Sequence, residues 1–285
     1  MRVRSLLILL FVLTVPVSVF SQELKPDEKW ATFEGNKVRY YDIGNSKAKN
    51  ALVLIHGWTC NADFWKDSLN AFPGYRVIAM DLPGHGRSDR PEISYTMEHF
   101  ARSVKAVLDN ANVNGAVLVG HSMGTPVATQ FYRLYPRSTI AIVDVDMPLL
   151  ALGSKEEMKG FVSSVIGNYP QSASTFIDGM ISSIRDANLR SFIKTSMLST
   201  PKHVAVSALT ETFDEKVWVT ELISVPVLAM IAKSATRQPI REDFAKVAPK
   251  VEFQLWADAG HFLMMEQPAR FNGQVKGFIL RNKLL

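Results

Sequence analysis

Hydrophobic residues along this chain gather in short runs that alternate with amphipathic stretches. Six apolar runs have the length and composition of buried strands: Ala51–Ile55, Val77–Met80, Ala116–Val119, Ile140–Val145, Val227–Ile231 and Val251–Trp256. Strands that are buried on both faces read as continuous apolar runs rather than as alternating ones. The pattern therefore predicts a parallel sheet with helices on both faces.

Three amphipathic stretches have the spacing of helices. Thr96 can cap a helix whose apolar face begins at Met97. A second helix is expected after Ser122 and should end at Pro136, and a third begins at Pro268. Short strands alternating with helices are typical of an α/β fold with a mostly parallel, doubly wound sheet.

The alternation stops in residues 148–224, which have helical spacing and no convincing strand. We interpret this stretch as an inserted helical cap over the carboxyl ends of the strands, where open α/β sheets bind ligands. The alternative is a set of helices packed on the edge of the sheet. The core domain would then consist of residues 22–147 and 225–285.

Residues 1–21 have the pattern of a cleaved secretory signal peptide. Arg2 and Arg4 precede an apolar run that is too short to span a bilayer comfortably, and small residues precede the expected cleavage site after Ser21. The protein is therefore expected to be secreted or periplasmic. An uncleaved membrane anchor is the alternative.

The composition is that of an ordinary globular protein, and it narrows the choice of partners. Of the 285 residues, 47% are hydrophobic and 21% are charged. The formal charge of +5 falls to +3 when Arg2 and Arg4 are removed. This mild charge and the lack of a basic run predict no nucleic-acid partner. Cys60 is the only cysteine, and the six histidines lack paired ligand spacing, so we expect no disulfide, metal or cofactor.

The segment Gly120-His121-Ser122-Met123-Gly124 carries the clearest chemical signal. A serine between two glycines, where a strand turns into a helix, has its hydroxyl on an exposed tip above the helix N-terminus. A serine hydroxyl is a poor nucleophile unless a base lies within hydrogen-bond reach. The candidate base is His261, because its loop follows the last predicted strand and should return to the same end of the sheet.

The other histidines have structural explanations. His56 and His85 lie in glycine-rich turns, where a ring often packs or bonds the backbone, and His121 is expected to point away from the site. His99 falls on a helix and His203 in the insertion.

An acyl-transfer reaction also needs N–H donors for the oxyanion of its tetrahedral intermediate. Met123 follows the serine and supplies one backbone N–H. The loop after the strand Ala51–Ile55 should supply the second, and Trp58 is the expected donor because Gly57 allows a tight turn before it.

Four segments together resemble the α/β-hydrolase superfamily, in the branch with a helical cap. They are His56-Gly57-Trp58, Asp81–Ser88, Gly120–Gly124, and Gly260-His261 followed by Glu266-Gln267-Pro268. The resemblance covers nearly the whole chain after residue 21. It implies Ser122 as nucleophile, His261 as base, and the N–H groups of Trp58 and Met123 as oxyanion hole. It also implies a mainly structural role for Asp81–Ser88.

The acid of the expected triad departs from the family pattern. Members usually carry an aspartate in the loop after the strand Val227–Ile231, where this chain has Ala235 and no carboxylate. Many haloalkane dehalogenases carry the acid at the end of the strand after the nucleophile helix. Asp146 falls on that position, 24 residues after Ser122 (146 − 122).

Other acids near these positions are weaker candidates. Asp144 lies on the same side of its strand as Asp146 but farther from the catalytic end. Glu242 and Asp243 are expected in the first turn of a helix, where carboxylates favour the dipole. Asp258, just before Gly260-His261, is expected to have no catalytic part. The remaining alternative is a dyad without an acid.

These residues predict a serine hydrolase that cleaves carboxylic esters through an acyl-enzyme. Lactonases, amidases or aminopeptidases, and C–C bond hydrolases share the machinery. An apolar acyl pocket could be formed by residues at helical spacing, which could equally be plain core: Met147, Leu149, Leu150, Phe161, Met180, Met197 and Leu198. Because of Ala235, a non-catalytic ligand-binding protein is a further alternative.

Overall fold

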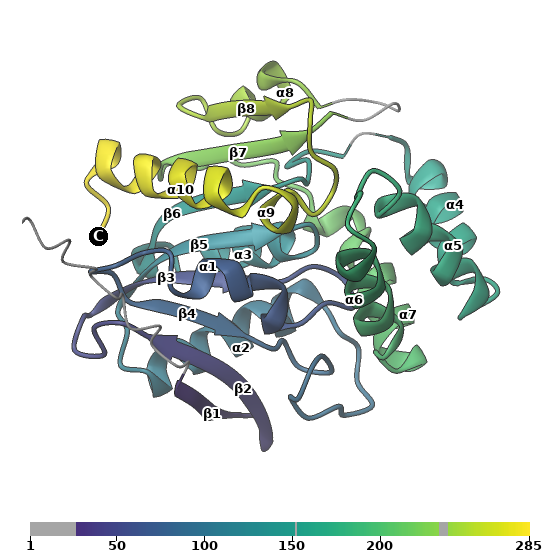
Figure 1. Ribbon diagram of the computed structural model, residues 1–285, viewed down its shortest axis with the longest axis horizontal. Coiled ribbons are helices and arrows are strands. Elements are labelled where there is room, and N and C mark those ends of the chain that lie inside the picture. Colours follow the sequence, from purple (N-terminus) through teal and green to yellow (C-terminus); the bar gives the residue numbers. More distant parts are fainter. Residues whose placement is uncertain (1–26, 152, 234–238) are drawn as a thin grey trace, which may run out of the picture.

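The computed structural model describes residues 27–151, 153–233 and 239–285 (Figure 1). In these residues eight strands form one sheet, in the order β1-β2-β4-β3-β5-β6-β7-β8. Strands β3 to β8 run parallel to one another, whereas β2 pairs antiparallel with both β1 and β4. The strands are β1 (Asp27–Phe33), β2 (Asn36–Ile43), β3 (Asn50–Ile55), β4 (Val77–Met80), β5 (Gly115–His121), β6 (Thr139–Val145), β7 (Val227–Ala232) and β8 (Glu252–Trp256).

The six strands predicted from apolar runs are confirmed, with ends that differ by at most two residues. The hairpin β1–β2 was not predicted, because its residues alternate between polar and apolar and include several charges. Its connection is the pair Glu34-Gly35, both with positive φ, which is the backbone that a two-residue hairpin loop with right-handed strand twist requires.

Helices cover both faces of the sheet. Figure 1 shows α1, α9 and α10 in front of the strands, with α2 and α3 behind them. The side chain of Thr96 caps α2 by accepting from the His99 N–H at 3.0 Å, as expected. The α-helices outside the cap are α1 (Lys66–Leu69), α2 (Met97–Asn110), α3 (Gly124–Leu134), α8 (Arg241–Ala245), α9 (Leu263–Glu266) and α10 (Pro268–Asn282) in the described residues.

The inserted helical cap is confirmed as part of the fold. Four α-helices of the described residues lie between β6 and β7 and stand together at one end of the sheet (Figure 1), namely α4 (Lys155–Ile166), α5 (Gln171–Met180), α6 (Ala187–Leu198) and α7 (Lys202–Thr212). The helices dock on the loop that follows β3, since the Trp58 indole N–H donates to the Ala205 carbonyl at 2.7 Å. The cap therefore covers the carboxyl ends of the strands rather than an edge of the sheet.

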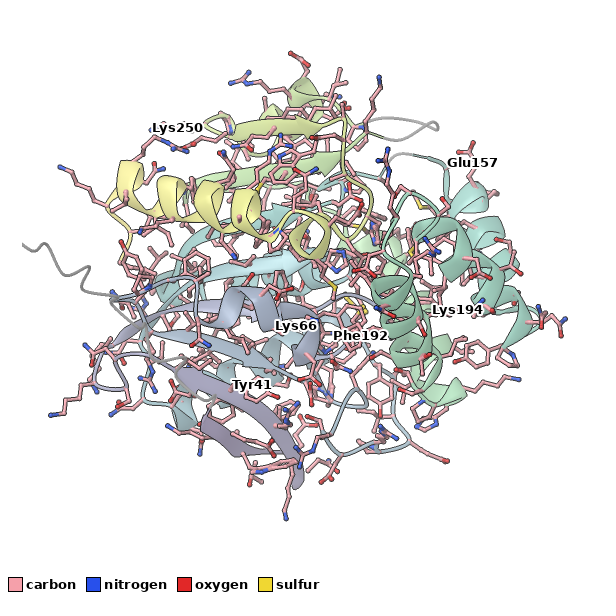
Figure 2. All side chains as sticks on the ribbon, viewed as in Figure 1. Tyr41, Lys66, Glu157, Phe192, Lys194 and Lys250 are labelled. Atoms are coloured by element: carbon pink, nitrogen blue, oxygen red, sulfur yellow. The ribbon has the colours of Figure 1, made fainter. Side chains whose placement is uncertain are left out.

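A second contact joins the cap to the core next to this loop. Figure 2 labels Phe192 on α6 and Lys66 on α1, whose ammonium lies 5.5 Å from the centroid of the Phe192 ring. Phe64 also packs against Phe192, with the two ring centroids 5.3 Å apart. The cap is thus anchored by packing as well as by hydrogen bonds.

The expected leader lies outside the described residues. None of the helices in the described part of the chain has the length and apolarity needed to cross a membrane.

Candidate active site

A cavity of about 1150 Å³ lies between the cap and the carboxyl ends of the strands. All five residues that the sequence assigned to the site line it: Trp58, Ser122, Met123, Asp146 and His261. The fold therefore gathers residues from four separate loops at one cavity.

Ser122 occupies the sharp turn between β5 and α3. Its φ is +50°, a left-handed backbone that is uncommon for a residue with a side chain. Its N–H donates to the Val145 carbonyl at the end of β6 at 2.9 Å. Strained backbone of this kind tends to occur at functional sites, where the surrounding structure holds it.

The two glycines around Ser122 are required for close packing. A Cβ on Gly120 would lie 2.3 Å from the Gly124 carbonyl oxygen, and a Cβ on Gly124 would lie 2.3 Å from the Ile55 carbonyl oxygen. Neither glycine has a positive φ, so the left-handed turn belongs to the serine itself. The glycines let α3 begin directly against β3 and β5.

The His261 side chain is hydrogen-bonded to Asp146. The distance between His261 Nδ1 and Asp146 Oδ2 is 2.7 Å. A carboxylate only accepts, so Nδ1 carries the proton and Nε2 is the ring atom left to face the cavity. Among the described residues no hydrogen bond joins this imidazole to the Ser122 hydroxyl, a bond that often forms only when substrate is bound.

Backbone atoms of strand β7 hold Asp146 in place. Its φ is +59°, and its own N–H donates to the Met230 carbonyl at 2.9 Å. The second carboxylate oxygen, Oδ1, accepts from the Ala232 N–H at 2.8 Å. The carboxylate therefore lies at the end of β6 and is hydrogen-bonded to the end of β7.

The other acids have different partners. Asp258 pairs with Arg270 at 2.8 Å, and Asp243 pairs with Lys246 at 2.9 Å. Glu242 and Asp243 lie in the first turn of α8, as predicted. Ala235 lies outside the described residues.

Asp144 is buried beneath the turn that holds Ser122. One of its oxygens accepts from the Thr125 hydroxyl at 2.7 Å, and burial raises the pKa of this carboxyl well above its usual value. Asp144 lies in the core and does not line the cavity, whereas Asp146 does.

Two backbone N–H groups at the cavity are free to bind an oxyanion. In the part of the chain that the structure describes, the N–H groups of Trp58 and Met123 have no protein acceptor. Gly57 brings the first of them close, because a Cβ on Gly57 would lie 3.1 Å from Ser122 Cβ. Unsatisfied donors next to a nucleophile are what stabilisation of a tetrahedral intermediate requires.

The buried histidines follow the expected roles, with one exception. The His56 ring bonds the Gly57 carbonyl at 2.8 Å and the His85 ring bonds the Pro83 carbonyl at 3.0 Å. Burial lowers their pKa values to about 4 and about 3. The exception is His121, which was expected to point away from the site but lines the cavity, with its ring centroid 4.8 Å from that of His261.

One wall of the cavity is aromatic, and the sequence revealed only part of it. The Phe161 ring lies 5.4 Å from Phe176 and 5.0 Å from Phe213, and Phe176 lies 6.1 Å from Trp58. Four of the proposed acyl-pocket residues line the cavity: Met147, Phe161, Met180 and Met197. Leu149, Leu150 and Leu198 do not line it.

Phe176 and Phe213 were missed because helical spacing within one segment does not show how the cap helices are turned toward one another. Among the described residues, no group of three or more His, Cys, Asp or Glu side chains is placed to hold a metal ion.

Residues 52–274 match the model of the Alpha/beta hydrolase family. The chain belongs to this family, and its mostly parallel eight-stranded sheet agrees with that membership.

Similarity to individual proteins is more local. The chain is 40% identical over 95 residues to a non-heme chloroperoxidase of Streptomyces lividans, covering 33% of this chain and 34% of that protein. It is 36% identical over 112 residues to a bifunctional esterase/perhydrolase of Acinetobacter calcoaceticus, covering 39% and 40%. These alignments thus span well under half of either relative.

A solved structure is similar over nearly its whole length. A structure described as an N-acyl homoserine lactone degrading enzyme superposes with a TM-score of 0.76 at 25% identity. The match covers 88% of this chain and 100% of that chain.

Proposed function

We propose that this protein is a serine hydrolase that cleaves carboxylic esters through an acyl-enzyme intermediate. The observation that carries the proposal is the hydrogen bond between His261 Nδ1 and Asp146 Oδ2, at a cavity that Ser122 also lines. That bond fixes the tautomer in which Nε2 can accept a proton, which is the state a general base needs. It also supplies an acid in a chain that has Ala235 at the usual position.

The reaction would proceed in two half-reactions. The Ser122 hydroxyl attacks the ester carbonyl while His261 Nε2 takes its proton, and the oxyanion binds the N–H groups of Trp58 and Met123. Collapse of this intermediate breaks the ester C–O bond, and the protonated His261 gives its proton to the leaving alcohol. A water molecule, activated by His261, then attacks the acyl-enzyme and releases the carboxylic acid and Ser122.

The identity of the nucleophile favours acyl transfer over the other chemistries of the family. Relatives that act on epoxides or on carbon–halogen bonds use an aspartate at this turn, where this chain has Ser122. A seryl ester can be hydrolysed at its carbonyl, which suits an ester substrate.

The aromatic wall supports an apolar acyl group as the part of the substrate that is recognised. Phe161, Phe176 and Phe213 form a contiguous surface that begins next to Trp58, one of the proposed oxyanion donors. An acyl chain bound with its carbonyl oxygen near that N–H would extend along these rings. Lactones are the second candidate substrate, because the similar solved structure is described as a lactone-degrading enzyme.

Covalent labelling and turnover test this proposal together. The purified protein should hydrolyse p-nitrophenyl butyrate, and a fluorophosphonate probe should label Ser122. Ser122→Ala should abolish labelling and lower turnover by roughly 10⁴-fold or more, because the nucleophile acts as a unit with its base. A wild-type protein that neither turns over esters and lactones nor reacts with the probe would make a non-catalytic binding protein the better reading.

We also propose that residues 1–21 direct export and are removed, on the pattern of Arg2, Arg4 and the apolar run that follows them. N-terminal sequencing of the protein recovered from the periplasm or medium of a bacterial host should begin at Gln22. A full-length chain that stays with the membrane fraction would indicate an anchor.

A further inference from the structure

The side chain of His121 connects the nucleophile turn to the base. His121 precedes Ser122 in the chain, and its Nε2 lies 2.8 Å from the backbone carbonyl oxygen of His261. A carbonyl only accepts hydrogen bonds, so Nε2 carries the proton and donates it. A residue next to the proposed nucleophile thus holds the main chain of the proposed base.

The hydrogen bond from His121 holds the backbone carbonyl of His261 in place. Among the described residues the His261 carbonyl has no donor other than His121. The neighbouring Gly260 is held separately, by its N–H donating to Glu266 at 2.9 Å. Without His121, the carbonyl of His261 would have no partner among the described residues, and the loop would lose its direct bond to β5, the strand that precedes Ser122.

The His121 ring is enclosed and electrically neutral. It is 1% exposed, with Trp65 edge-on at 6.5 Å between ring centroids and Phe262 at 5.2 Å. Burial lowers its pKa well below the usual 6.5. Its other nitrogen, Nδ1, is buried without a partner and lies 3.0 Å from where a Cβ on Gly57 would sit.

A buried polar atom without a partner destabilises the fold, so its retention needs an explanation. A hydrophobic side chain of similar size would avoid that cost at this position. Unlike a hydrophobic side chain, His121 supplies an N–H donor that binds the backbone carbonyl of His261.

We infer that His121 is a positioning residue, whose Nε2–H···O bond to His261 sets the separation of the Ser122 hydroxyl and the His261 imidazole. The inference rests on the proposed function. Ser122 is already fixed to the acid strand by its N–H bond to Val145, so the two tethers together fix the geometry of nucleophile, base and acid. Misplacement of reacting groups by about 1 Å can lower a rate roughly 10²-fold.

Two replacements of similar size distinguish the loss of the hydrogen-bond donor from a change in side-chain volume. His121→Gln keeps an amide N–H at about the reach of Nε2, and His121→Met removes the donor. We expect His121→Met to lower kcat for p-nitrophenyl butyrate by about 10- to 100-fold with KM within twofold, and to slow the acylation burst in proportion. His121→Gln should stay within about fivefold of wild type.

His99→Met is the matched control. The His99 side chain, on α2, packs with its ring centroid 4.9 Å from that of Phe33 and does not line the cavity. It should leave kcat unchanged even if it lowers the melting temperature. The tautomer of His121 gives a readout that does not depend on any variant folding, since ¹⁵N NMR of the wild-type protein should find the proton on Nε2.

Three results would overturn the inference. One is a His121→Met protein with wild-type kcat, the second is an equal loss in the Met and Gln variants at equal stability, and the third is a proton on Nδ1. A wild-type protein without turnover or Ser122 labelling would instead overturn the proposed function, and this inference with it.

Discussion

His261 Nδ1 and Asp146 Oδ2 lie 2.7 Å apart although 115 positions separate the two residues in the chain. Asp146 reaches this place because β6 ends next to β7, whose Ala232 N–H binds the second carboxylate oxygen at 2.8 Å. His261 reaches it because the loop after β8 returns over the same end of the sheet. The pair therefore joins the ends of two strands that flank β7.

Replacing the acid should reveal its role in catalysis. Asp146→Asn should lower kcat by roughly 10³- to 10⁴-fold, because an amide N–H facing Nδ1 favours the wrong imidazole tautomer. Asp258→Asn is the first control, since this carboxylate is bonded to Arg270 at the surface. Glu242→Gln and Asp243→Asn are further controls for the two acids in the first turn of α8. Steady-state kinetics with p-nitrophenyl butyrate measure the effect. Nearly full activity of Asp146→Asn would show that the acid lies elsewhere.

The fully buried His56 and His85 should make the protein sensitive to mild acid. Burial lowers their folded pKa values to about 4 and about 3, whereas an unfolded histidine titrates near 6.5. Below pH 6.5 the unfolded chain binds protons that the folded chain refuses, so stability is complete above that pH and falls as the pH decreases. Each ring should contribute about 1.4 kcal/mol per pH unit until its folded pKa is reached.

Urea unfolding at pH 7, 6 and 5 would measure this loss. A free energy of unfolding that stays constant from pH 7 to pH 5 would contradict the prediction.

Gly120 should not tolerate a methyl group. A Cβ there would lie 2.3 Å from the Gly124 carbonyl oxygen and 2.5 Å from the Thr125 nitrogen, which are backbone atoms that cannot rotate away. Gly120→Ala should therefore destabilise the protein by about 1–3 kcal/mol and reduce labelling of Ser122. Gly160→Ala on α4 is the control, because a Cβ there meets nothing within 4 Å.

The control substitution should stabilise the helix by about 0.5–1 kcal/mol. Thermal unfolding of both variants measures the contrast. Equal stability of Gly120→Ala and wild type would mean that the tight approach of β5 to α3 is not as described.

Phe176 should determine how the rate depends on the length of the acyl chain. Phe176→Ala removes the ring between Phe161 and Trp58, and should lower kcat/KM for p-nitrophenyl octanoate by about 10-fold more than for the acetate. Phe192→Ala is the control, because Phe192 packs on Lys66 and Phe64 and does not line the cavity. An unchanged ratio of the two rates in Phe176→Ala would remove the aromatic wall from the acyl site.

The strands and helices of the core were predictable because their sequence patterns are local. Six buried strands, the Thr96 cap and the turn at Ser122 each follow from residues within a few positions of one another. The hairpin β1–β2 was not predicted, because a hairpin at the edge of a sheet needs fewer apolar residues than a central strand. The close packing of Gly124 could not be predicted either, since a Cβ there would collide with the backbone of Ile55 on another strand.

By itself, the sequence determined the fold class, the serine at the strand–helix turn, the candidate base and a short list of acids. It did so because periodicity, glycines and strand ends are recorded in consecutive residues. Only the tertiary structure decided which acid bonds His261, which cap rings face Trp58, and that His121 holds the His261 carbonyl. These contacts join residues from different elements, and a hydrogen bond of 2.7 or 2.8 Å depends on how the strands and helices pack, which spacing along one chain does not specify.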